Sequence, residues 1–124
     1  MAFFLNNNTT NMFKAAKQLT NLSKDFTIAI KKMEHVKNLD EIIEVYEKSV
    51  AICSEIEQVS EQAMLSAGIA AAEDRIEEII TTTTKALTDL IEKAENKEET
   101  RQAVLACDET FAEEILDGVQ QTLK

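Results

Sequence analysis

Apolar side chains recur at helical intervals, mostly of three or four residues, from Met12 to Leu123. This spacing places them on one face of an α-helix, whereas a half-buried strand would need strict alternation. The chain has no proline, and Gly68 and Gly118 are its only glycines, so tight turns between strands have little support. The pattern therefore predicts an all-α protein, and 124 residues are a usual size for one domain.

Four amphipathic segments can be distinguished by their start signals. Thr9, Thr10 or Asn11 can cap the first segment. Asn38 and Asn96 each have a glutamate three residues later, which is the spacing of a capping box, so helices are expected to start there. A third stripe resumes at Ile69. The fourth segment is predicted to turn these residues inward: Val104, Cys107, Phe111, Ile115, Val119 and Leu123.

Segments of similar length with short connections favour a four-helix up-down bundle over residues 9–124, preceded by a flexible N-terminal arm over residues 1–8. The alternative is one long central helix over residues 39–95 that packs against a second copy in a dimeric coiled coil. The two arrangements differ in the role that they give to Gly68. It is either the turn between two helices or a small residue within a continuous helix that lets another backbone approach.

Charge divides the chain into a basic start and an acidic remainder. Residues 1–38 hold six lysines and two acidic residues, although the net charge of the whole chain is −10. The predicted basic stripe lies opposite the apolar seam of the first helix and consists of Lys14, Lys17, Lys24, Lys31 and Lys32. The predicted acidic face lies near the C-terminus and consists of Glu109, Glu113, Glu114 and Asp117.

Residues with catalytic or metal-binding chemistry are few. His35 is the only histidine, so a Glu-x-x-His di-iron pattern on two helices is excluded. Cys53 and Cys107 both fall on apolar stripes, where a thiol usually acts as a small hydrophobe. Phosphate-binding glycine loops and short hydrolase signatures are absent. We therefore predict a protein that is not an enzyme and has no cofactor, catalytic residue or metal site.

The charge pattern predicts a protein-interaction or assembly protein that self-associates, with the basic helix of one copy on the acidic face of another. A second interpretation is an acidic inhibitor that mimics nucleic acid and blocks a cationic protein. A third is a peripheral membrane protein whose basic helix lies on anionic lipid. Direct nucleic-acid binding is not expected, because both molecules would be negative. Two cysteines without a CxxC pair predict a cytoplasmic or virion location.

Overall fold

The computed structural model describes residues 2–107 and 111–119, without the side chains of residues 2–12, 112 and 114. Its elements are α1 (Ala2–Met33), α2 (Leu39–Gln62), α3 (Ser66–Lys93), α4 (Lys97–Leu105) and the π-helix η1 (Ala112–Leu116). The described residues contain no strand. The prediction of an all-α bundle of about four helices is confirmed.

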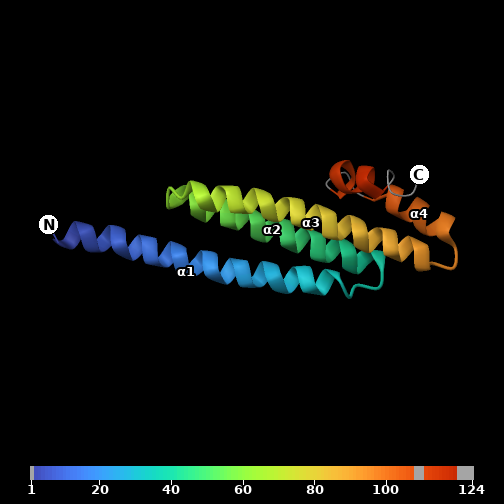
Figure 1. The fold of residues 1–124 in the computed structure, drawn as a ribbon, viewed down its shortest axis with the longest axis horizontal. Coiled ribbons are helices and arrows are strands. Elements are labelled where there is room, and N and C mark those ends of the chain that lie inside the picture. Colours follow the sequence, from blue (N-terminus) through green and yellow to red (C-terminus); the bar gives the residue numbers. More distant parts are fainter. Residues whose placement is uncertain (1, 108–110, 120–124) are drawn as a thin grey trace.

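The first three helices lie side by side and alternate in direction, and the chain after α4 folds back along α3 (Figure 1). α2 packs on both α1 and α3, while α1 contacts α3 much less. α1 begins at Ala2 and projects past the connection between α2 and α3. Residues 2–8, which we expected to form an arm, therefore continue α1, and their flexibility stays a prediction.

Both asparagine caps form as the sequence predicts. The Asn38 side chain accepts a hydrogen bond from the Glu41 backbone N–H at 2.9 Å, and the Glu41 carboxylate accepts one from the Lys37 backbone N–H at 3.0 Å. At the start of α4, the Asn96 side chain accepts from the Glu99 backbone N–H at 3.1 Å. These bonds satisfy amide groups that have no partner inside the helix, which fixes where α2 and α4 begin.

The chain reverses between α2 and α3 through a Schellman motif. Leu65 N–H donates to the Ser60 carbonyl at 2.7 Å, and Met64 N–H donates to the Glu61 carbonyl at 3.1 Å. In this motif the residue that follows the C-cap takes a left-handed backbone conformation, and that residue is usually glycine. Here Met64 adopts this conformation, with φ of 58°.

Gly68 has a different role, because it lies in the first turn of α3 against α2. A Cβ atom built on Gly68 would collide with the Ser60 hydroxyl and lie 2.8 Å from Ser60 Cβ. Glycine therefore allows the two helices to approach closely just after the reversal. The alternative of one helix over residues 39–95 is wrong, and so is the assignment of the turn to Gly68 itself.

The fourth predicted helix is broken into two parts, which corrects the expectation of one continuous segment. α4 ends at Leu105, and the chain is helical again from Phe111 to Val119, including η1. A π-turn holds more residues than an α-turn, so adjacent residues point in more similar directions, and both Ile115 and Leu116 are buried. Of the predicted inward residues, Val104, Phe111, Ile115 and Val119 are buried, Cys107 is half-buried, and Leu123 lies outside the described residues.

Candidate interaction surfaces

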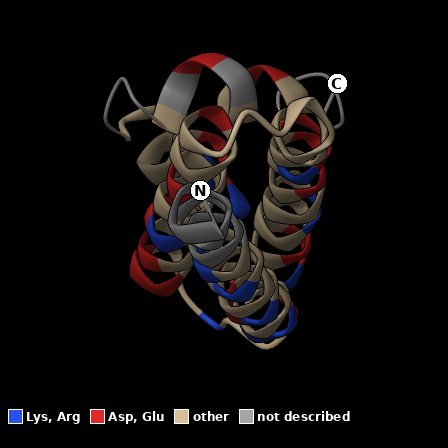
Figure 2. Cartoon of the chain, turned by 90° about the vertical axis from the view of Figure 1, so that its left-hand side faces the viewer, with Lys and Arg blue, Asp and Glu red and all other residues tan. Residues whose placement is uncertain are grey.

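The basic stripe of α1 is fully on the outside of the bundle. Lys17, Lys24 and Lys31 are exposed at intervals of seven residues, and Lys14 and Lys32 beside them are also exposed. None of these five lysines forms a hydrogen bond or an ion pair in the described structure. Seen along the bundle from the end where α1 begins, the basic residues gather on α1 while acidic residues dominate elsewhere (Figure 2).

Contacts on the inner side of α1 set this orientation. Phe26 is 1% exposed, and the Arg75 guanidinium from α3 lies 5.0 Å from the centre of its ring. The same guanidinium donates a hydrogen bond to the Ser23 hydroxyl at 3.2 Å. A cation over an aromatic face is favourable, and more so where water is excluded. These contacts hold the rotation of α1 about its axis and so direct its lysines outward.

Two large apolar side chains share the outer face of α1 with the lysines. Phe13 is 71% exposed and Ile28 is 63% exposed. With Met64, they are the large apolar residues that the described part of the molecule leaves most exposed. Phe13 lies four residues before Lys17, and Ile28 lies between Lys24 and Lys31. The basic surface of α1 therefore combines positive charge with exposed apolar area, a combination common at sites where proteins bind partners.

Only part of the predicted acidic face lies among the side chains that the structure describes. Glu113 and Asp117 are exposed on the C-terminal helix, whose inner residues Phe111 and Ile115 are buried. Phe111 packs edge-on against Tyr46 of α2, with ring centres 5.2 Å apart, which places this segment over α2 and α3. Glu109 and the Glu114 side chain lie outside what the structure describes. Two of the four predicted residues are thus placed on the surface.

A second acidic surface, which the sequence analysis did not assign, runs along the outer side of α2. Asp40, Glu44, Glu47 and Glu55 are all exposed and follow one side of the helix, opposite the buried Ser49 and other core residues. We call these four residues the α2 acidic row. Their spacing of four, three and eight residues is the sequence signal that keeps them on one side of a helix.

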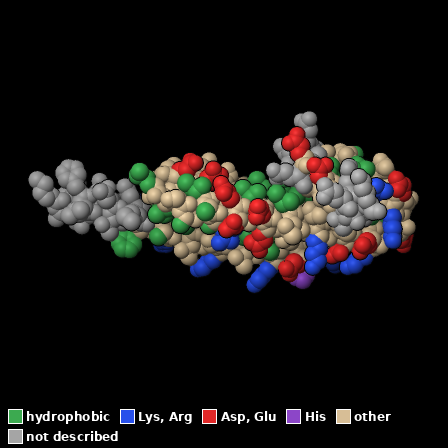
Figure 3. All heavy atoms as spheres, turned by 45° about the horizontal axis from the view of Figure 1, so that its top comes forward, with side chains coloured by type: hydrophobic (Ala, Val, Ile, Leu, Met, Phe, Trp, Pro, Cys, Tyr) green, Lys and Arg blue, Asp and Glu red, His purple; other side chains and the backbone are tan. Residues whose placement is uncertain are grey.

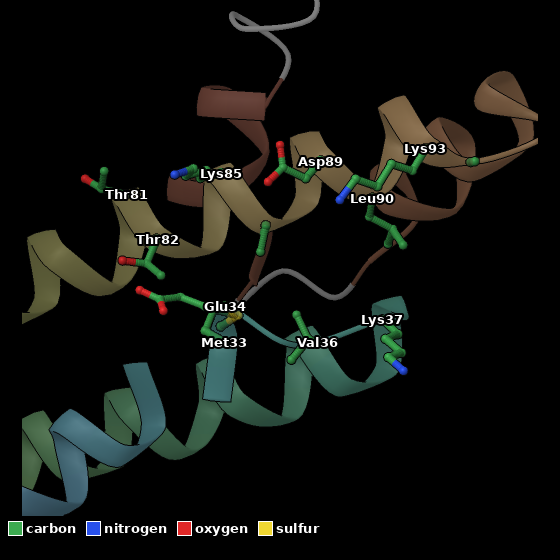
Figure 4. A pocket seen from close by; sticks show the side chains of 12 residues that line it. Met33, Glu34, Val36, Lys37, Thr81, Thr82, Lys85, Asp89, Leu90 and Lys93 are labelled. Carbon is green, nitrogen blue, oxygen red and sulfur yellow. The ribbon is translucent and has the colours of Figure 1, made fainter. Parts of the chain in front are cut away.

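A groove lies between the end of α1 and the second half of α3 (Figure 4). Its volume is about 750 Å³, and Val36 and Leu90 contribute apolar surface to it. The groove is lined by charges of both signs, namely Glu34, Lys37, Lys85, Asp89 and Lys93. It therefore favours no single charge in a ligand.

Figure 3 shows another side of the molecule, where acidic side chains are spread over the face and basic side chains project along its lower edge.

The cysteines and the histidine form no reactive constellation in the described structure. Burial raises the pKa of the Cys53 thiol from 9.0 to about 11, an effect that Arg75 opposes and Glu78 reinforces. Burial also raises the pKa of Cys107, with a smaller contribution from Asp40. Both thiols are protonated at neutral pH, and a thiol is a weak nucleophile compared with a thiolate. His35 is exposed beyond the end of α1.

Comparison with known proteins adds no relative: no family model matches the chain, and no curated protein or solved structure is significantly similar to it. Within the described residues, no three His, Cys, Asp or Glu side chains are grouped so that they could hold a metal ion. None of the described helices combines the length and the apolar character that crossing a membrane requires.

Proposed function

We propose that this chain is a non-enzymatic assembly protein, in which the basic face of α1 in one copy binds an acidic surface of the next copy. The observation that carries the proposal is the outward row of lysines on one helix of a chain whose net charge is −10. Such a protein presents both partners of an electrostatic interface on a single molecule. Complementary charges steer association and set its orientation.

Surface ion pairs contribute little singly, typically under about 1 kcal/mol each, and salt screens them. Several pairs acting together, with the exposed Phe13 and Ile28 nearby, give a weak but oriented contact. The two binding surfaces differ, so the contact is heterologous. Repeated contacts of this kind close into a ring or extend into a filament, according to the rotation between copies.

Sedimentation velocity at low and high salt tests the proposal. The protein is expected to form oligomers at about 20 mM NaCl and monomers at about 500 mM, because the Debye length falls from about 20 Å to about 4 Å. Replacing Lys17, Lys24 and Lys31 by glutamate should abolish the oligomers at low salt. A wild-type protein that is monomeric under both conditions contradicts the proposal.

A matched control separates a specific face from net charge. Lys93, Lys97 and Arg101 lie at the end of α3 and on α4; the two lysines are exposed and Arg101 is partly exposed. Their replacement by glutamate changes the net charge by the same amount as the α1 variant but leaves the basic face intact. This control should still form oligomers, although more weakly, because long-range repulsion increases equally in both variants.

The α2 acidic row gives some support to a second function, that of an acidic inhibitor that mimics nucleic acid. Carboxylates on one exposed helix face can occupy a cationic groove in place of phosphates. The test is competition with duplex DNA for a histone, chosen as a basic probe. Wild-type protein should displace the DNA, and a variant with Glu44, Glu47 and Glu55 replaced by lysine should not. Absence of displacement by the wild type removes this candidate.

A further inference from the structure

The outer faces of α1 and α2 carry opposite charges at nearly the same intervals. Lys17, Lys24 and Lys31 are seven residues apart, so the row is about 21 Å long at the helical rise. Asp40 and Glu47 are also seven residues apart, and Glu55 follows eight residues later, so this row is about 22 Å long. Two helices that lie side by side can therefore bring all three positions of each row together.

We propose that the α2 acidic row is the docking surface for α1 of a second copy of this chain, with the two helices antiparallel. This inference rests on the proposed self-association and names its acceptor surface. In this alignment the residue numbers of opposed positions add to about 71. The pairs are Lys31 with Asp40, Lys24 with Glu47, and Lys17 with Glu55.

The antiparallel direction follows from the fold. α1 and α2 are consecutive antiparallel helices, and both turn their apolar stripes toward the same core. Their outer faces consequently point to different sides of the molecule. When a neighbouring copy has its long axis in the same direction as the first copy, its α1 runs antiparallel to α2 of the first copy. Each copy then uses α1 on one side and α2 on the other, and the contact can repeat.

The other acidic surfaces fit the lysine row less well. The described C-terminal helix, residues 111–119, is only about 13 Å long and places Glu113 and Asp117 on the surface. On the outer face of α3, the exposed Lys85 lies between Glu78 and Glu92 and would repel a lysine row. The α2 acidic row has the required length, and the exposed Lys48 lies beside the row and not between two residues spaced seven apart, as Lys85 does on α3.

Uncharged residues complete the match. Between Glu47 and Glu55 the outer side of α2 carries the exposed Ala51, whose small side chain allows another helix to approach. In the proposed alignment Phe13 lies opposite the exposed Gln58, one turn beyond Glu55, the last residue of the row. The exposed ring then loses water against an uncharged side chain, and this burial adds to the ion pairs.

Charge reversal tests both the surface and the alignment. Lys24→Glu is expected to weaken association at low salt by about tenfold, because it removes a pair and creates repulsion with Glu47. The double variant Lys24→Glu/Glu47→Lys restores the opposed charges and should return to within about threefold of the wild type. Sedimentation equilibrium at about 20 mM NaCl measures the constants, and circular dichroism verifies that each variant is folded.

Two further variants identify the acceptor surface and the alignment. Lys24→Glu/Glu55→Lys reverses a charge of the same row that does not oppose position 24 in the proposed alignment. Lys24→Glu/Asp117→Lys reverses a charge on the C-terminal surface. Neither should restore association as well as Glu47→Lys does. Equal rescue by Glu55→Lys overturns the alignment, and better rescue by Asp117→Lys moves the acceptor to the C-terminal surface.

The same experiments distinguish this inference from the proposed function. If the wild type associates at low salt but Glu47→Lys gives no rescue, the α2 acidic row is not the acceptor and self-association stands. If the wild type stays monomeric, both fail. Co-sedimentation with phosphatidylserine vesicles then tests the remaining alternative, which is binding of the basic face to anionic lipid. Vesicle binding that Lys24→Glu abolishes would assign the basic face to lipid and overturn the inference.

Discussion

The α2–α3 hairpin and α1 bury apolar stripes of the same kind but have different surroundings. α2 and α3 pack on each other and receive α1 on one side and the C-terminal segment on another. α1 has neighbours along its inner side only, and its outer half carries lysines, Phe13 and Ile28. The hairpin therefore holds the fold together, whereas α1 both completes the core and presents a surface to partners.

The largest expected effect compares the two sides of α1 with one residue type. Phe26→Ala removes a buried ring and should lower the free energy of unfolding by about 3–5 kcal/mol. Phe13→Ala removes an exposed ring and should change it by less than about 0.5 kcal/mol. Urea denaturation followed by circular dichroism measures both. Equal losses of stability in the two variants would mean that both sides of α1 are buried.

A change just after the reversal between α2 and α3 should have the next largest effect. In an exposed helix, Gly→Ala is stabilising by about 1 kcal/mol. At Gly68 the new Cβ would press on Ser60, so Gly68→Ala should instead lower the free energy of unfolding by about 1–3 kcal/mol. Adding Ser60→Gly removes the collision and should recover part of the loss. A stabilised Gly68→Ala protein would show that the helices do not approach closely here.

Alkaline pH probes the centre of the hairpin through Cys53. Its pKa is raised from 9.0 to about 11, so between these values the unfolded chain releases a proton that the folded chain keeps. The free energy of unfolding should then fall as pH rises, by about 1.4 kcal/mol at pH 10. Cys53→Ala is the reference, because all other groups titrate alike in both proteins. Identical pH profiles would place Cys53 in contact with water.

The smallest effect concerns the reversal between α2 and α3. Met64 is 89% exposed and has φ of 58°, so its side chain contributes strain and little burial. Met64→Gly should raise the free energy of unfolding by about 0.5–1 kcal/mol, seen as a higher Tm in thermal denaturation. Met64→Ala keeps the strained conformation and should give no gain. A gain of the same size with alanine would assign the effect to the loss of the methionine side chain.

Local signals in the sequence predicted the helical class, the caps at Asn38 and Asn96, and the outward direction of Lys17, Lys24 and Lys31. Each depends on residues within a turn or two of one another. The signals failed where distant segments meet. Gly68 looked like a turn because nothing in the sequence shows that Ser60 lies against it, and the break after Leu105 carries no glycine or proline.

The candidate surfaces divide in the same way. The basic stripe follows from helical spacing, because a lysine opposite an apolar seam must face water. The α2 acidic row has equally regular spacing, but its value as an acceptor depends on which sides of α1 and α2 remain uncovered. That property belongs to the packed bundle and is not a property of either helix alone.

The sequence by itself determined that this chain forms amphipathic helices, with positive charge near the start and negative charge after it, because helix period and side-chain charge are local properties. Only the tertiary structure decided that Met64 makes the reversal, that the fourth helix divides, and that two outer faces of opposite charge stay open. These outcomes depend on contacts between residues far apart in the chain, whose packing outweighs local preference.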